Sequence, residues 1–147
     1  MKIKIETIAN LPDTEVIIRS NGESDDAKRI AATLRLFDKM VPCRKDGINY
    51  AVPSQDVFYF ECVNDRIFCY TEKEVYETSY RLYELEEIFA RTMFLRVNKY
   101  TILNADKIEG FKSALNGRME AMLTNGEKIE ISRYYVPALK VLLGGKI

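Results

Sequence analysis

Two-residue turns that contain asparagine are the feature of this 147-residue chain that most restricts its fold. Asn64-Asp65, Asn116-Gly117 and Asn125-Gly126 each separate two runs that are rich in β-branched, aromatic or other apolar residues. Asn, Asp and Gly adopt positive φ at low cost, and a two-residue turn with positive φ matches the twist of two antiparallel strands. We therefore expect short antiparallel hairpins, with Asn116-Gly117 and Asn125-Gly126 forming type I′ turns of one meander.

The spacing of apolar residues predicts the remaining strands and three helices. Strands are expected at 2–8, 14–19, 49–52, 56–63, 66–71, 75–78, 94–103, 107–115, 118–123 and 128–131. Apolar residues recur every three or four positions in 25–40, 80–90 and 134–143, which is typical of one face of a helix. Pro42 is expected to end the first helix, and Ser79 to cap the second.

These elements predict a mainly β (α+β) chain, because the strand–helix–strand alternation of doubly wound folds is missing. The first two strands and the first helix form a separate group before Pro42. We therefore expect an N-terminal β-β-α appendage at residues 1–42 and a larger domain at residues 43–147. The appendage is too short to fold alone, so it must pack on the larger domain or on another chain.

Charge and hydropathy exclude several classes of protein. The 22 Lys and Arg residues balance 22 Asp and Glu residues, so a globally basic nucleic-acid binder is not indicated. No apolar run reaches the roughly 20 residues of a membrane-spanning helix, and no signal peptide opens the chain, which predicts a cytoplasmic location. Residues 88–147 nevertheless hold ten cations and five carboxylates, a local excess that suits a phosphate-binding surface.

The side chains that catalysis and metal binding commonly use are scarce. The absence of histidine removes Ser-His-Asp and Cys-His catalysis and the commonest partner of a zinc site. Cys43, Cys62 and Cys69 are not spaced as a C-x-x-C motif and are expected to be reduced thiols in strands or the core. No phosphate-binding loop, dinucleotide-binding loop or EF-hand loop is present. We therefore expect no enzyme activity, catalytic residue, cofactor, metal or small-molecule substrate.

Four segments between Gly47 and Leu143 carry a more specific pattern. They read DVFYFE at 56–61, L-x-x-L-E at 82–86, FLRVNKYTILN at 94–104, and NG at 125–126 followed by ISR at 131–133. In their order and spacing they resemble the LytTR DNA-binding domain of bacterial transcription regulators. The third segment has Asn98 where that family usually has His and Tyr100 where it usually has Ser. An asparagine still donates hydrogen bonds to a phosphate or a base edge.

The resemblance implies an elongated LytTR-like β-β-β sandwich of short antiparallel strands with short helices, whose loops on one edge enter the major groove. The DNA-binding candidates that match the family's motifs are Asn64, Arg66, Arg96, Asn98, Lys99, Ser132 and Arg133. Lys99 and Arg133 have the chemistry to neutralise phosphates or reach guanine edges. Ser132 and the amides that open the last helix are expected to bind a phosphate oxygen. Arg96 is alternatively a structural ion-pair partner, and Asn64 a turn former.

The resemblance also implies a sequence-specific, double-stranded DNA-binding transcriptional regulator. Residues 1–42 are too short for the receiver domain that often precedes such a domain. Family members bind promoter direct repeats as dimers, so a homodimer through residues 1–42 is expected, and a small membrane protein that inhibits the regulator is a possible partner. The alternative is a protein-interaction module without DNA binding, which the neutral total charge and the acidic residues 46–87 favour.

Overall fold

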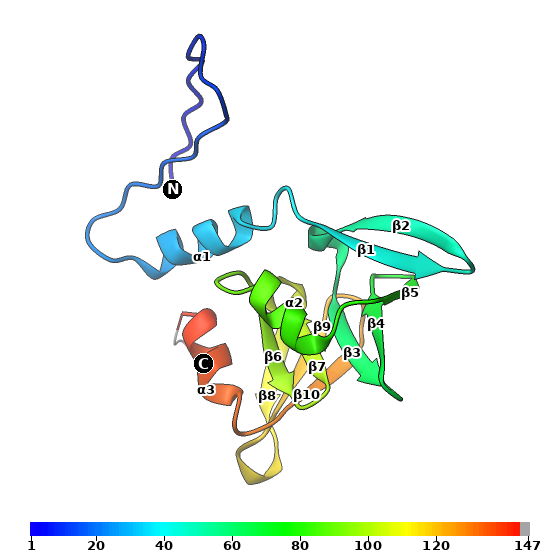
Figure 1. The fold of residues 1–147 in the computed structure, drawn as a ribbon. Coiled ribbons are helices and arrows are strands. Elements are labelled where there is room, and N and C mark those ends of the chain that lie inside the picture. Colours follow the sequence, from blue (N-terminus) through cyan, green and yellow to red (C-terminus); the bar gives the residue numbers. More distant parts are fainter. Residues whose placement is uncertain (145–147) are drawn as a thin grey trace.

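The computed structural model describes residues 1–144, in which antiparallel pairing builds two sheets (Figure 1). The order of strands is β2-β1-β5-β4-β3-β7-β6 in the larger sheet and β10-β9-β8 in the smaller one. The strands are β1 Met40–Lys45, β2 Ile48–Pro53, β3 Tyr59–Val63, β4 Arg66–Tyr70, β5 Val75–Thr78, β6 Phe94–Asn98, β7 Thr101–Asn104, β8 Ile108–Ser113, β9 Met119–Leu123 and β10 Lys128–Ile131. The expected mainly β (α+β) fold class is confirmed. The hairpin β1–β2 joins the larger sheet through the single pair Arg44–Glu77.

Two hydrophobic cores lie on opposite faces of the larger sheet. On one face, Phe60 of β3 and Ile102 of β7 pack with Leu85 of helix α2 (Leu82–Ile88). On the other face, Leu103 of β7 packs with the smaller sheet and with Leu139 of helix α3 (Val136–Leu142). Because β3 and β7 are covered on both faces, only their ends and the connecting turns reach solvent.

The first helix is shorter than its spacing predicts. Helix α1 covers Asp25–Leu34, and the Ser24 side chain accepts a hydrogen bond from the Ala27 N–H at 3.3 Å. The prediction that the helix continues to residue 40 and ends at Pro42 is wrong, because Pro42 lies inside β1. Val41 and Cys43 flank this proline and are both buried, so burial on alternate residues sets a strand there.

The strands expected at 2–8 and 14–19 do not form. Residues 1–23, which we call the N-terminal arm, contain neither helix nor strand, and all their side chains are exposed. Figure 1 shows the arm projecting away from the rest of the molecule. Two short runs without a third strand or a packed face are at best marginally stable in water. The arm therefore lacks a partner within the described part of the chain.

Local turn chemistry differs from the prediction at three places. The strand expected at 94–103 is the hairpin β6–β7, because the Asn98 Oδ1 accepts the Tyr100 N–H at 2.9 Å and reverses the chain. Gly126 has a φ of 88°, but its preceding Asn is not in the left-handed region, so this turn is not type I′. Helix α2 begins after Arg81, whose N–H donates to Glu84, and not at Ser79.

The other two asparagine turns are confirmed. Asn64 and Asp65 have φ values of 51° and 61°, and Asn116 and Gly117 have values of 60° and 75°. The cysteines are free thiols within strands, as expected. None of the helices in the described residues has the length and apolar character needed to cross a membrane.

Candidate nucleic-acid interface

The ends of three distant strands meet at one edge of the fold. Strands β3 and β6 both pair antiparallel with β7, so they run in the same direction and end at the same edge. The Cys62 N–H donates to the Tyr100 carbonyl at 2.8 Å, which places the β3–β4 turn beside the β6–β7 turn. The Ser132 N–H donates to the Val97 carbonyl at 2.9 Å, which brings the end of β10 to the same place.

The loop between β8 and β9 completes this edge, and sequence reasoning did not select it. A Cβ added at Gly117 would lie 3.5 Å from the Cβ of Arg133. The neighbouring Arg118 places its Nη1 3.3 Å from the Oε1 of Glu130, at the end of β10. The predicted meander implied this placement, because β9 runs antiparallel to β10 and the start of β9 must therefore lie beside the end of β10.

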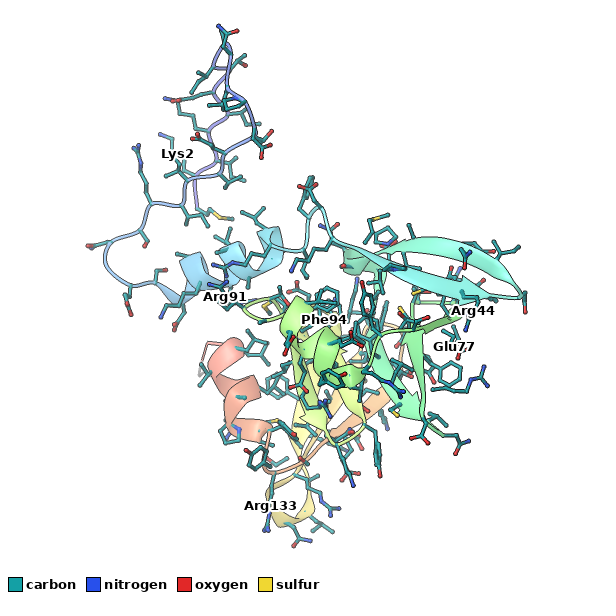
Figure 2. All side chains as sticks on the ribbon, in the orientation of Figure 1. Lys2, Arg44, Glu77, Arg91, Phe94 and Arg133 are labelled. Carbon is teal, nitrogen blue, oxygen red and sulfur yellow. The ribbon has the colours of Figure 1, made fainter. Side chains whose placement is uncertain are left out.

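We call these four turns the turn edge. It consists of residues 64–66, 98–100, 116–118 and 132–133. Figure 1 shows the connecting turns on the lower side of the molecule, and Figure 2 shows Arg133 at its lower tip beside the β8–β9 loop. All seven residues selected from the sequence lie on or next to this edge.

Two exposed cations of the turn edge, Lys99 and Arg133, form no ion pair within the described residues. Within residues 1–144, no carboxylate lies within 4 Å of either side chain's nitrogen atoms. The Lys99 ammonium lies 5.5 Å from the centre of the Tyr100 ring, which is itself exposed. These two side chains come from different sheets, since Lys99 follows β6 and Arg133 follows β10.

Arg96 is largely withdrawn from solvent. Its side chain is 17% exposed, its Nη2 pairs with Glu86 of α2, and its Nη1 donates to the Lys99 carbonyl at 2.8 Å. These contacts connect helix α2 to the β6–β7 turn. The arrangement corresponds to the ion-pair alternative that the sequence left open for this residue.

Arg66 also contacts a carboxylate. Its Nε and Nη2 donate to Glu77 at 3.0 and 2.7 Å, and the Arg44 guanidinium lies 3.9 Å from the same carboxylate. The hydrogen bonds from Arg66 lower the pKa of the Glu77 carboxyl below its ordinary value. Asn64 is exposed at the adjoining turn, where its positive φ makes it a turn former.

Asn98 and Ser132 hold the edge together. The Asn98 Nδ2 donates to the Glu130 carbonyl at 3.0 Å, which ties the β6–β7 turn to β10. The Ser132 carbonyl accepts the N–H groups of Tyr135 and Val136 at 2.9 and 3.2 Å, and Pro137, the next residue, has no N–H. The Tyr135 and Val136 amides at the start of α3 therefore already have a partner, while the binding of a phosphate oxygen by Ser132 and this helix end stays a prediction.

The described residues contain no group of three His, Cys, Asp or Glu side chains that could hold a metal ion. The chemistry that the turn edge offers is instead that of cations, amides and hydroxyls. These groups suit phosphate oxygens and the hydrogen-bonding edges of bases.

Known proteins resemble this chain in both fold and sequence. A solved LytTr DNA-binding domain from Bacillus cereus superposes with a TM-score of 0.68 at 22% identity, covering 73% of this chain and 98% of that domain. The sensory transduction protein LytT of Enterococcus faecalis is 27% identical over 104 residues, which are 71% of this chain and 43% of that protein. The transcriptional regulatory protein LytR of Staphylococcus aureus is 25% identical over 130 residues, which are 86% of this chain and 53% of that protein.

The chain spans about half the length of these curated relatives. The family model of the LytTr DNA-binding domain matches residues 48–144, which contain the whole turn edge. The described fold and this match agree in extent, since both sheets lie almost entirely within those residues. The chain belongs to the LytTr DNA-binding domain family.

Proposed function

We propose that this chain regulates transcription by binding specific sites in double-stranded DNA through the turn edge. The observation that carries the proposal is the placement of Lys99 and Arg133 on turns that the fold holds at one edge, as exposed cations with no carboxylate of residues 1–144 beside them. The names of the relatives LytT and LytR, one a sensory transduction protein and one a transcriptional regulatory protein, support the same role.

The roles of the residues follow from their contacts. Lys99 and Arg133 neutralise phosphates or donate to guanine O6 and N7 in the major groove. The exposed Asn64 and the Ser132 hydroxyl add uncharged donors at the two sides of the edge. Arg96 contacts Glu86 and a backbone carbonyl, so it acts as a positioning residue for the β6–β7 turn.

The site in DNA is proposed to hold two direct repeats, one for each copy of a dimer. A single small edge makes few base contacts, and two linked modules gain affinity from the second contact being intramolecular. This arrangement raises both the affinity and the length of sequence that is read.

Selection of bound duplexes from a random pool tests the proposal directly. The full-length chain is expected to enrich one sequence motif. Titration of that duplex should then show that Arg133→Ala weakens binding by about 1–3 kcal/mol and lowers the slope of log affinity against log salt by about 0.9.

Lys73→Ala is the matched control, because Lys73 is an exposed cation in the loop between β4 and β5. Strand β4 runs antiparallel to β3, so this loop lies at the opposite edge of the sheet. The control variant should bind as the unchanged protein does. Failure to enrich any motif, or equal losses for the Lys73 and Arg133 variants, would contradict the proposal.

A further inference from the structure

The tip of the β8–β9 hairpin carries a large apolar side chain that nothing in the described chain covers. Leu115 is 84% exposed, and among the large apolar side chains of residues 24–144 it is the most exposed. The tip is continuous with the turn edge, which includes residues 116–118. Transfer of an apolar side chain out of water is favourable, so a ligand of the turn edge that covers Leu115 gains affinity from it.

Backbone hydrogen bonds fix the position of Leu115 at this tip. The Ala114 N–H donates to the Arg118 carbonyl at 2.9 Å, and the Arg118 N–H donates to the Leu115 carbonyl at 3.3 Å. Between them, Asn116 and Gly117 reverse the chain with φ values of 60° and 75°. Because the turn is closed before any ligand arrives, little backbone freedom is lost when the tip binds.

The tip is uncharged, which suits the interior of a DNA groove. Residues 113–117 read SALNG and contain no ionisable side chain. Lys112 and Arg118 flank the tip, and each lies beside a glutamate of the adjacent strand, at 3.7 and 3.3 Å. A carboxylate at the tip would be repelled by the phosphates on either side of a groove, and any charge there would be costly to remove from water.

The tip also lies beside one of the two cations that carry the proposed function. A Cβ added at Gly117 would be 3.5 Å from the Cβ of Arg133. Leu115 is two residues before Gly117, so its Cα lies at most about 7 Å further along the chain. A groove that Arg133 reaches is therefore the groove that Leu115 meets.

The shape of the hairpin favours the major groove. Strands β8 and β9 form a two-stranded antiparallel ribbon up to the tip. The major groove is about 12 Å wide and admits such a ribbon, whereas the minor groove is only about 6 Å wide. Figure 1 shows this loop, in yellow, as the lowest part of the molecule in that view, beyond the other turns of the edge. The tip is thus placed to reach base edges ahead of its neighbours.

We propose that Leu115 enters the major groove at the tip of the β8–β9 hairpin and recognises a thymine through its C5-methyl group. The other groups that the four bases present in this groove are hydrogen-bond donors and acceptors, so the thymine methyl is the partner that an uncharged, apolar side chain selects. The inference rests on the proposed function, because it requires the turn edge to bind duplex DNA. It adds an apolar contact that specifies a base to the cations and uncharged donors already described.

Deoxyuridine substitution tests this contact, because uracil differs from thymine only by lacking the C5-methyl group. The duplex selected with the full-length chain is prepared again with one thymine at a time replaced by uracil. At one position, the unchanged chain should bind about fourfold more weakly, as expected when one methyl group is lost from an apolar contact. Leu115→Ala should bind the thymine duplex at least about fourfold more weakly and should not distinguish thymine from uracil at that position.

Val141→Ala is the matched control, since Val141 is 78% exposed on helix α3. Figure 1 shows α3 running away from the turn edge, and Val141 lies near its far end. The control variant should keep both the affinity and the fourfold preference for thymine. Urea denaturation should give both variants nearly the free energy of unfolding of the unchanged chain, because both side chains are exposed.

Three results overturn the inference. The first is full affinity of Leu115→Ala for the selected duplex. The second is an unchanged chain that binds every uracil duplex as tightly as the thymine duplex. The third is a uracil effect of equal size in Leu115→Ala and in the unchanged chain, which assigns the methyl contact to another residue. In all three cases an enriched motif and the effect of Arg133→Ala still support the proposed function, whereas a selection that enriches no motif contradicts both.

Discussion

Replacement of Arg96 by methionine tests whether Arg96 positions the turn edge or contacts DNA itself. Methionine keeps much of the packing of the arginine stem but removes the guanidinium. The hydrogen bond from a charged donor to the Lys99 carbonyl contributes about 1.5–3 kcal/mol. The pair with Glu86, whose side chain is 44% exposed, contributes up to about 1 kcal/mol.

One contribution has the opposite sign. The Arg96 Nε is buried and has no hydrogen-bond partner within the described residues, so its removal relieves about 1 kcal/mol of desolvation. The net expectation is a loss of about 2 kcal/mol in the free energy of unfolding. Urea denaturation of the full chain measures this loss through the shift of the midpoint at constant slope.

DNA titration at several salt concentrations supplies the second measurement. Arg96→Met should weaken binding because the β6–β7 turn loses its support, while the salt slope stays unchanged. Lys99→Met should instead lower that slope by about 0.9, since the proposed function gives Lys99 a phosphate contact, and should leave stability nearly unaltered. If Arg96→Met lowers the slope as Lys99→Met does and leaves the free energy of unfolding unchanged, Arg96 contacts phosphate and the reasoning is refuted.

Two further predictions concern buried polar groups. Asn104 is 1% exposed, and its side chain makes two hydrogen bonds to backbone groups, of 2.9 and 3.1 Å. Asn104→Ala should therefore lower the free energy of unfolding by about 2–4 kcal/mol, measured by urea denaturation. A loss below about 1 kcal/mol would contradict the assigned contacts. Burial and the hydrogen bond to Glu127 raise the pKa of the Tyr59 hydroxyl above its ordinary value, so the folded state keeps this proton after the unfolded state has lost it. Above pH 10 the free energy of unfolding should therefore fall with pH by about 1.4 kcal/mol per unit more steeply in the unchanged protein than in Tyr59→Phe. Equal dependence of the free energy of unfolding on pH in the two proteins would refute the assignment.

Local sequence predicted those elements whose conformation depends on neighbouring residues alone. Asn64-Asp65 and Asn116-Gly117 adopt positive φ at low energetic cost, because Asn and Asp tolerate this region and Gly has no Cβ. Both hairpins were therefore predictable. The β6–β7 turn has no such pair and relies on the Asn98 side chain accepting a backbone N–H, a weaker signal that a continuous apolar pattern conceals.

The arm and the first helix show the opposite case. Residues 2–8 and 14–19 have the composition of strands, but a strand needs a neighbour, and the described chain has none for them. Residues 35–39 have helical spacing, but strand pairing of β1 with β2 begins at Met40 and excludes a longer helix. In the arm the missing partner prevented the strands that the local pattern favours, and at residues 35–39 the tertiary pairing of β1 overrode the local pattern.

The amino-acid sequence by itself determined the antiparallel hairpins, the α+β class and the cationic residues available for a phosphate-binding surface. These properties depend on backbone preferences and charge, which each residue carries with it. Only the tertiary structure decided that β3, β6 and β10 end at one edge. It also decided that Arg66 and Arg96 pair with carboxylates, whereas Lys99 and Arg133 pair with none in the described part of the chain. The reason is that pairing between strands distant in the chain, not local spacing, sets which side chains become neighbours.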